Sequence, residues 1–329
     1  MIILFDRFKM DRKAAVRPWR SALLSAWLLG LPAAPLHAQA PLAGRGAETG
    51  DPAEREIVVT GARGDLSDRI GAFVAAVTAE TGNAQVARWD RRLCLHVEGL
   101  SPGQRDYIAG EIAAAGREVG LEIAGSGRCD GSAFVIFSAD PDALLRRIGV
   151  TRPRFFGAIP AARRRELLAI SGPVRWLSYA QLRGAEGEGP SSFHAAAISS
   201  GSERPVPALR TTPSRLTSGA RMDLQSMVVL VDASRLQGVS NRSLAAYLTM
   251  VVLGNVRTDH GVAGSVSILG MFEAARSGTV VTEGLSEWDR AYLRALYSGT
   301  PNMPAAQRMQ RIGVLMEGQL AAGPPGDPR

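Results

Sequence analysis

Apolar residues recur at helical spacing in several segments of the chain. In LSDRIGAFVAAVTAETG (66–82) they stand at positions i, i+3, i+4 and i+7, which predicts an amphipathic helix. Residues 101–120 begin with a capping serine and a proline and carry a similar stripe. Residues 285–299 and the segment SNRSLAAYLTMVVLG (240–254) also read as helices. Ser286 and Asp289 resemble a capping box, and Ser240 is the expected N-cap of the other helix. All four predicted helices offer an apolar face to a core.

Short runs rich in β-branched and aromatic residues alternate with these helices. The predicted strands are RRLCLHVEGL (91–100), LEIAG (121–125), SAFVIFSA (132–139), PVRWLSYAQLRG (173–184) and MVVLVDAS (227–234). Helices and strands are intermixed along the chain, so we expect an α+β fold with a mixed sheet and packed helices.

Composition divides the chain into parts. Residues 39–65 are rich in Gly, Ala, Pro and Glu and predict a flexible N-terminal segment. An N-terminal α+β part should cover 66–150, and a C-terminal part 151–312. The Gly-, Ser-, Pro- and Thr-rich stretch 184–216 predicts a mobile loop, and 313–329 a disordered tail.

The first 38 residues have the order of a secretory signal peptide: a basic start, a Pro-interrupted apolar stretch, and the small-residue sequence HAQA. We expect cleavage after Ala38, because a cut after Ala40 would place Pro41 beside the scissile bond. An uncleaved anchor is the alternative. No later stretch is long and apolar enough to predict a membrane span, so the mature chain is expected in the periplasm or outside the cell.

Removing this segment changes the charge argument. Residues 1–38 hold six of the 38 basic and two of the 31 acidic residues, so 32 arginines and 29 acidic residues remain, a net charge of +3. Both lysines, Lys9 and Lys13, lie in the leader. A nucleic-acid partner is not expected, because no strong basic stripe is left.

The chain has two cysteines, Cys94 and Cys129. In an exported protein such a pair predicts a disulfide, and closing a 35-residue loop stabilises the fold by roughly 3–4 kcal/mol in the chain-entropy model. A reactive thiol is the alternative. It would need a basic partner, and His96 is near in sequence but not placed to activate Cys94.

Residues that carry chemistry are sparse. There is no G-x-S-x-G motif and no phosphate-binding loop, and the histidines of the mature chain stand far apart. Ser191 and His194 fall in the predicted loop, where a nucleophile is hard to hold in place. Asp232 ends a strand, where it serves either a site or a turn and cap. His260 lies beyond the helix 240–254 without a partner, and no cofactor is predicted.

The segment EIVVTGAR (56–63) resembles the Ton box of TonB-dependent outer-membrane receptors. Ile57, Val58, Val59 and Thr60 favour a strand, and Gly61 ends the run. The resemblance implies that such a strand pairs with the edge of an envelope protein's sheet. The other interpretations are an edge strand of this protein's own sheet, or a flexible tail.

The order of elements resembles that of zincin-type metalloproteases, and more closely a little-characterised family of secreted bacterial zincin-like proteins. The resemblance covers roughly residues 66–312, and LSEWDRAYLRALY (285–297) matches the LT-x-x-D-x-x-x-L-x-x-LY ending of that family. It implies a zincin-like mixed sheet and places the helix 240–254 at the position of the zinc helix.

True zincins carry H-E-x-x-H on that helix, two imidazoles for zinc and a glutamate that activates water. With Gly254 at the glycine of the extended motif, the ligand positions are Tyr247 and Val251, and the general-base position is Leu248. None of these can act, so either the zinc site is lost or the helix was only ever part of the core. We therefore expect a non-catalytic exported binding protein. The alternative is a hydrolase that uses Asp232, Ser191 or His194.

Overall fold

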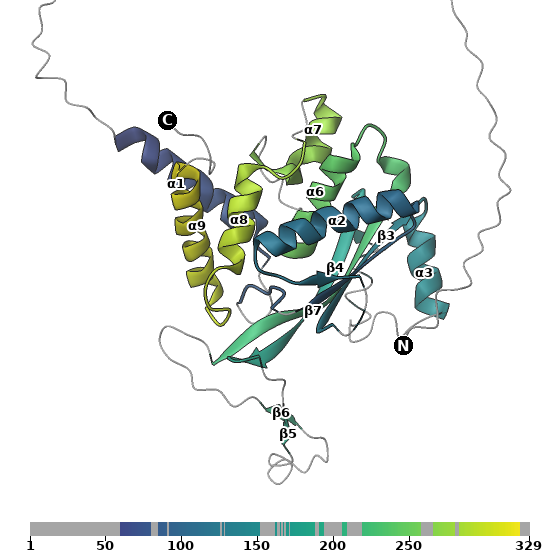
Figure 1. Cartoon of the computed structure of the whole chain (residues 1–329), viewed down its shortest axis with the longest axis horizontal. Helices are drawn as coiled ribbons and strands as arrows, with labels where there is room; N and C mark the ends of the chain where they lie inside the picture. The colour runs from purple at the N-terminus through teal and green to yellow at the C-terminus, as the bar shows by residue number, and fades with distance from the viewer. Residues whose placement is uncertain are drawn as a thin grey trace, which may run out of the picture. The chain divides into compact units, whose positions relative to one another are not determined.

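The fold is described from a computed structural model. It describes residues 60–79, 85–90, 92–125, 127, 129–151, 162, 165, 167, 169–170, 172–187, 191–193, 206–208, 219–257, 266–279 and 283–322. All of them belong to one compact unit, Ile57–Arg329. The chain has an α+β fold built on a five-stranded mixed sheet (Figure 1).

The sheet has the strand order β2-β1-β3-β7-β4. Its first four strands are parallel, and β4 runs antiparallel to β7 along one edge. Their bounds are β1 Leu93–Glu98, β2 Ile123–Ala124, β3 Gly131–Ser138, β4 Val174–Gly184 and β7 Ala220–Asp232. Within the described residues, the first part of β7 pairs with β4, and β7 joins β3 only from Ser226 onward.

One face of the sheet is covered by helices that form the larger core. Alternate residues of β3, among them Ala133, Val135 and Phe137, point into this core. The helices α2 and α6 lie side by side over this face (Figure 1). The contributing helices are α1 Thr60–Val77, α2 Pro102–Glu118, α6 Asn241–Gly254, α8 Glu287–Tyr297 and α9 Ala305–Ala322.

The opposite face carries a smaller core. Val228 and Leu230 of β7 point to this side, while their neighbours Val229 and Val231 point to the larger core, as the alternation of a strand requires. The helix α3, Pro141–Thr151, covers this side through Leu145. Because both faces are covered, the central strands are nearly continuous apolar runs.

The second half of the chain also carries two short 3-10 helices and one further α-helix among its described residues. They are η4 Ala233–Arg235, η6 Ile268–Gly270 and α7 Met271–Ser277. The predicted capping box of α8 is present: Ser286 Oγ accepts from the Asp289 N–H at 3.1 Å, and an Asp289 carboxylate oxygen accepts from the Ser286 N–H at 2.9 Å. Asp289 also binds Ser267 and Ile268, which fixes η6 against α8.

The structure corrects the N-terminal prediction. The helix α1 begins at Thr60, so Thr60 and Gly61 are helical rather than the end of a strand. Ile57, Val58 and Val59, like the predicted signal peptide, lie outside the described residues. The strand propensity of Thr60 is overridden because it begins the helix α1, which is stabilised by packing along α9.

The structure also corrects the expected tail. The helix α9 continues to Ala322, with Ile312 and Met316 fully buried, so residues 313–322 belong to the fold. Only 323–329 of that segment lie outside the described residues. Polar residues dilute the apolar stripe of α9, and packing against α1 and α8 stabilises it as a helix.

The other boundaries also change. The sheet joins 66–150 to 151–312, because β3 pairs directly with β7. Within the expected loop 184–216, β5 (Ser191–Phe193) and β6 (Val206–Ala208) form a two-stranded antiparallel ladder. None of the helices in the described parts of the chain is both long and apolar enough to cross a membrane.

Candidate functional site

The helix α6, which the resemblance places at the zinc position, is fixed at both ends. Ser240 Oγ accepts from the Ser243 N–H at 3.1 Å, as predicted for an N-cap. At the other end, the Val252 carbonyl accepts from the Trp89 indole at 2.7 Å, and the Leu253 carbonyl accepts from the Tyr297 hydroxyl at 2.9 Å. These bonds satisfy carbonyl groups that a helix end leaves without an intrahelical partner.

Every residue of α6 from Ser243 to Gly254 is buried. Leu248 and Val251 have no exposed surface, and Tyr247 is 4% exposed with its ring 5.0 Å edge-on from that of Phe272. The three positions that the resemblance assigns to the zinc ligands and the general base therefore pack in the core. In this structure α6 acts as a core helix.

The weaker sequence candidates are dispersed. Asp232 caps η4, where its carboxylate accepts from the Ser234 N–H at 3.0 Å and from the Ser234 hydroxyl. Ser191 lies in β5, paired with Ala208. His194 and His260 lie outside the described residues. In the described part of the chain, no three His, Cys, Asp or Glu side chains are close enough to hold a metal ion.

The predicted disulfide is present. Cys94 of β1 is joined to Cys129, with the two Cα atoms 5.6 Å apart, a normal separation for this bond. The alternative of a reactive thiol at Cys94 is therefore wrong in this oxidised state, and the nearby His96 stacks on Phe134 instead. The bond holds the segment before β3 against β1, directly beside Asp130 and Gly131.

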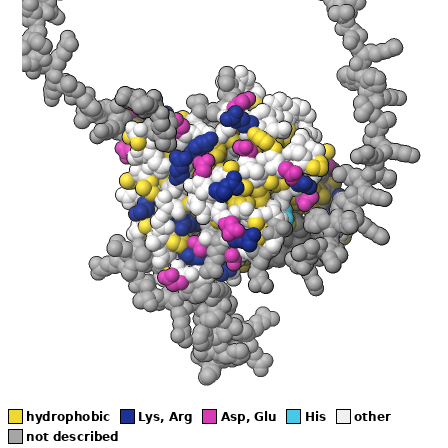
Figure 2. Space-filling model, in the orientation of Figure 1, with side chains coloured by type: hydrophobic (Ala, Val, Ile, Leu, Met, Phe, Trp, Pro, Cys, Tyr) yellow, Lys and Arg dark blue, Asp and Glu magenta, His cyan; other side chains and the backbone are white. Residues whose placement is uncertain are grey.

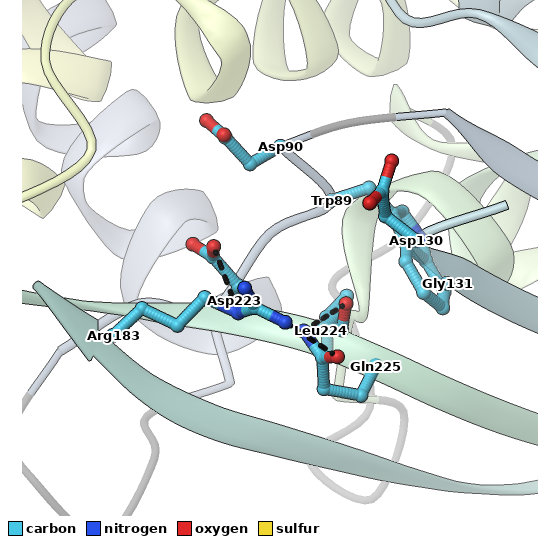
Figure 3. A pocket seen from close by; sticks show the side chains of 8 residues that line it. All are labelled: Trp89, Asp90, Asp130, Gly131, Arg183, Asp223, Leu224 and Gln225. Atoms are coloured by element: carbon cyan, nitrogen blue, oxygen red, sulfur yellow. Dashed lines mark hydrogen bonds and ion pairs between the residues drawn. The ribbon is translucent and has the colours of Figure 1, made fainter. Parts of the chain in front are cut away.

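A polar pocket opens beside these residues, at the amino ends of β3 and β7. It has an empty volume of ≈ 240 Å³, open solvent included. Figure 3 shows the Asp90 and Asp130 carboxylates above the strands that carry Arg183, Asp223 and Gln225. The lining residues are Trp89, Asp90, Asp130, Gly131, Arg183, Asp223, Leu224 and Gln225.

Local packing gives the pocket its shape. The indole ring of Trp89 packs against Gly131, and a Cβ atom at Gly131 would stand 2.6 Å from this ring. Residues 85–90 are held to β7 by a bridge between Arg88 and Asp223, with the Leu224 N–H donating to the Arg88 carbonyl at 3.0 Å. A glycine at the first position of β3 therefore leaves room for the Trp89 ring.

Two arginines face each other across the strands behind the pocket. Arg183 of β4 is directly opposite Arg221 of β7, an arrangement that is unfavourable without counter-charges. Arg221 pairs with Asp90 and, at 3.1 Å, with Asp223, while Arg183 Nε lies 3.7 Å from the same Asp223 oxygen, Oδ2. Arg183 also donates to Gln225 Oε1 at 3.1 Å and to a backbone carbonyl.

The Asp223 carboxylate is the most enclosed charge of this cluster. Its side chain is 5% exposed, and burial raises the pKa of the Asp223 carboxyl, opposed by the neighbouring Arg221 charge. Both ion pairs use Oδ2. The other oxygen, Oδ1, is buried and has no hydrogen-bond partner among the described residues. A buried carboxylate oxygen without a partner marks a position where a donor group is missing.

Sequence reasoning missed this cluster, although a signal was present. Arg221, Asp223 and Gln225 alternate with Met222 and Leu224, the period-two pattern of a strand. The predicted strand began only at residue 227, where the apolar run starts, whereas β7 begins at Ala220. Extending the predicted strand to residue 220 would have placed these polar side chains on one face. It would not have predicted their contacts with Asp90 and Arg183.

Comparisons of the chain with models of known protein families, with curated proteins and with solved structures find no match. The resemblance to zincin-like proteins therefore stays a prediction. On the face of the molecule in Figure 2, arginine and acidic side chains are interspersed among apolar ones over the described part of the surface.

Proposed function

We propose that this chain is an exported, non-catalytic binding protein of the cell envelope, with a zincin-like arrangement of sheet and helices. The observation that carries the proposal is the burial of every α6 residue from Ser243 to Gly254. A zinc enzyme needs its ligand helix to line a site with an open coordination position. Tyr247, Leu248 and Val251 instead fill the core.

The compartment is inferred from the disulfide together with the N-terminal sequence. A cysteine pair joined in this way persists in oxidising compartments such as the periplasm. Residues 1–38 have the order of a signal peptide. The test is the intact mass of the protein isolated from the periplasm of the expressing bacterium. A mass that begins at Gln39 with both thiols oxidised supports export, and a retained leader refutes it.

The absence of catalysis is tested by metal content and activity together. The oxidised chain that follows residue 38 is purified without chelators, supplemented with zinc, and assayed on a panel of peptide and ester substrates. We expect neither near-stoichiometric zinc nor turnover. Zinc bound in a one-to-one ratio, or turnover that Asp232→Ala, Ser191→Ala or His194→Ala abolishes without unfolding the protein, would refute the proposal.

An envelope partner remains part of this proposal. Ile57, Val58 and Val59 are the residues that would extend a partner's sheet, since the helix α1 begins directly after them. Deleting residues 56–59 should abolish binding to the isolated C-terminal domain of TonB and leave the thermal unfolding temperature unchanged. Binding that survives the deletion, or no binding by the intact protein, would remove this partner from the proposal.

A further inference from the structure

The polar pocket at the amino ends of β3 and β7 has one unused acceptor. Asp223 is 4% exposed, and its Oδ1 atom has no hydrogen-bond partner among the described residues. Both arginines that neutralise this carboxylate contact Oδ2 instead. Asp223 lines the pocket, so a group that enters it and donates a hydrogen bond to this buried oxygen would supply the missing partner.

The charge of the lining favours a cation. Three carboxylates, those of Asp90, Asp130 and Asp223, line the pocket with the Arg183 guanidinium. Arg221 pairs with Asp90 and Asp223, so three carboxylates face two guanidinium groups, an excess of one negative charge. Arg183 is already engaged by Gly187, Gln225 and Asp223. Asp130 is exposed at the pocket and forms no ion pair with any other described residue. An anion would meet this excess of negative charge and is disfavoured.

The spacing of the carboxylates excludes a bare metal ion as the best occupant. Among the described residues, no three acidic, histidine or cysteine side chains lie close enough to surround one ion. A cation that donates hydrogen bonds needs only one oxygen in direct contact, and the other charges attract it from a distance. The small space, ≈ 240 Å³ with open solvent included, suits one end group rather than a whole drug-sized molecule.

The disulfide supports the same site. Cys129 directly precedes Asp130, and its bond to Cys94 of β1 holds this segment beside the sheet. The Asp130 N–H also donates to the Arg92 carbonyl at 3.0 Å. The exposed carboxylate is thereby kept at the pocket by a covalent bond and a backbone hydrogen bond, although its own side chain forms no ion pair there.

We propose that this pocket binds a single primary alkylammonium group, which donates to Asp223 Oδ1 while Asp130 and Asp90 supply attracting charge. The group is the end of a free amine or the side chain of a partner's lysine. This inference deepens the proposed binding function and rests on it. Its test reports only on the pocket, so its failure would leave the assays of zinc, turnover and export unaffected.

The test uses the oxidised chain that follows residue 38, labelled with ¹⁵N, at pH 7. n-Butylammonium chloride is titrated against it, and n-butanol in sodium chloride of equal ionic strength serves as the uncharged probe. The expected result is a saturable shift of the Trp89 indole and Gly131 amide signals with the amine and none with the alcohol. Equal shifts with both probes, or none with either, would overturn the proposal.

Two variants and a control localise the effect. Asp130→Asn, at an exposed carboxylate, should weaken amine binding by about 1.5- to 5-fold, the range for exposed charge pairs. Asp223→Asn should weaken it by roughly tenfold or more, because a hydrogen bond to a charged group is lost. Glu111→Gln, an exposed change on α2, should have no effect. Equal affinity in the unsubstituted protein and all three variants would overturn the site. If Asp223→Asn is unstable, equal affinity in the unsubstituted protein and Asp130→Asn would overturn it.

A further titration separates the two sources of the ammonium group. N-Acetyl-lysine methylamide offers the same group with peptide bonds on both sides. If it shifts the same signals at a lower concentration than n-butylammonium, the site takes a partner's lysine; the reverse order assigns it to a free amine. Both results support the proposal. A stronger effect of sodium acetate than of either amine would overturn it.

Discussion

Replacing Leu248 by glutamate tests whether α6 is a core helix or the remnant of an open site. Leu248 has no exposed surface, and the resemblance to zincins assigns it to the position of the catalytic glutamate. In an open cleft the introduced carboxylate would remain hydrated and cost little. In the core it must either lose its hydration or take up a proton.

The structure sets the size of the effect. Full burial raises the pKa of a carboxyl group by about 3–5 units, and each unit corresponds to about 1.36 kcal/mol. Leu248→Glu should therefore lower the free energy of unfolding by about 3–4 kcal/mol at pH 7 and about 4–5 kcal/mol at pH 8, before any loss of apolar contacts. Since a domain is stabilised by only about 5–15 kcal/mol in total, the variant should be close to unfolded at pH 8.

Urea unfolding followed by circular dichroism at pH 5 and pH 8 measures this effect. A raised pKa in the folded state means that the folded protein binds the proton more tightly, so stability falls as pH rises above about 4.3. The loss should be smaller at pH 5 than at pH 8. Val314→Glu, on a side chain that is 64% exposed, is the matched control and should change stability by less than about 0.5 kcal/mol.

One outcome would refute the reasoning. A loss below about 1 kcal/mol at both pH values would mean that water reaches position 248 and that α6 borders a cleft. If Leu248→Glu does not fold at either pH, Leu248→Ala gives the same information by another route. A cavity in the core costs about 2–5 kcal/mol, whereas truncation of a solvent-exposed leucine costs far less. Leu248→Met, which keeps the volume, should lose less than about 1.5 kcal/mol.

Three further predictions follow from individual contacts. Replacing both Cys94 and Cys129 by alanine should lower the free energy of unfolding by about 3–4 kcal/mol, measured in urea against the oxidised protein. Because burial raises the pKa of Asp223, its contribution to stability should fall as pH rises above about 3.9; the stability of Asp223→Asn, followed from pH 4 to 7, should lack that decline. In thermal melts, Gly99→Ala should lower the free energy of unfolding by more than about 2 kcal/mol, because φ is +87° and the new Cβ would lie 2.2 Å from the Phe137 carbonyl oxygen. Gly103→Ala, in open space on α2, is the control and should be neutral or stabilising.

The elements of the fold were predictable where a local pattern decides them. The stripe of α8 and its capping box at Ser286 and Asp289 are confirmed, as are the N-cap Ser240 and the strands β1, β3 and β4. Each depends on residues a few positions apart, whose spacing is visible in the sequence. The same holds for the disulfide, because the chain offers only one pair of cysteines.

The charged cluster could not be predicted in this way. Asp90, Arg183 and Arg221 come from segments far apart in the sequence, and only the pairing of β4 with β7 and the bridge at Arg88 bring them together. Arg183 reads locally as the end of an amphipathic strand, and Asp90 as a loop residue. The joining of residues 66–150 and 151–312 in one sheet could not be predicted for a similar reason, because the pairing of β3 with β7 is a non-local contact.

The location of the pocket follows from how the two ends of the sheet are filled. The helix after β1 covers one face and the helix after β3 the other, so a crevice for ligands would ordinarily form between the carboxyl ends of these two strands. Here Gly99 packs against the Phe137 carbonyl at that point, and Asp232 is occupied as a cap. The amino ends differ, because β7 extends beyond β3 there and pairs with β4 alone among the described strands. Polar side chains on this extension, together with Trp89 and Gly131, line the opening found there. A ligand site at the amino ends is therefore the arrangement that this topology permits.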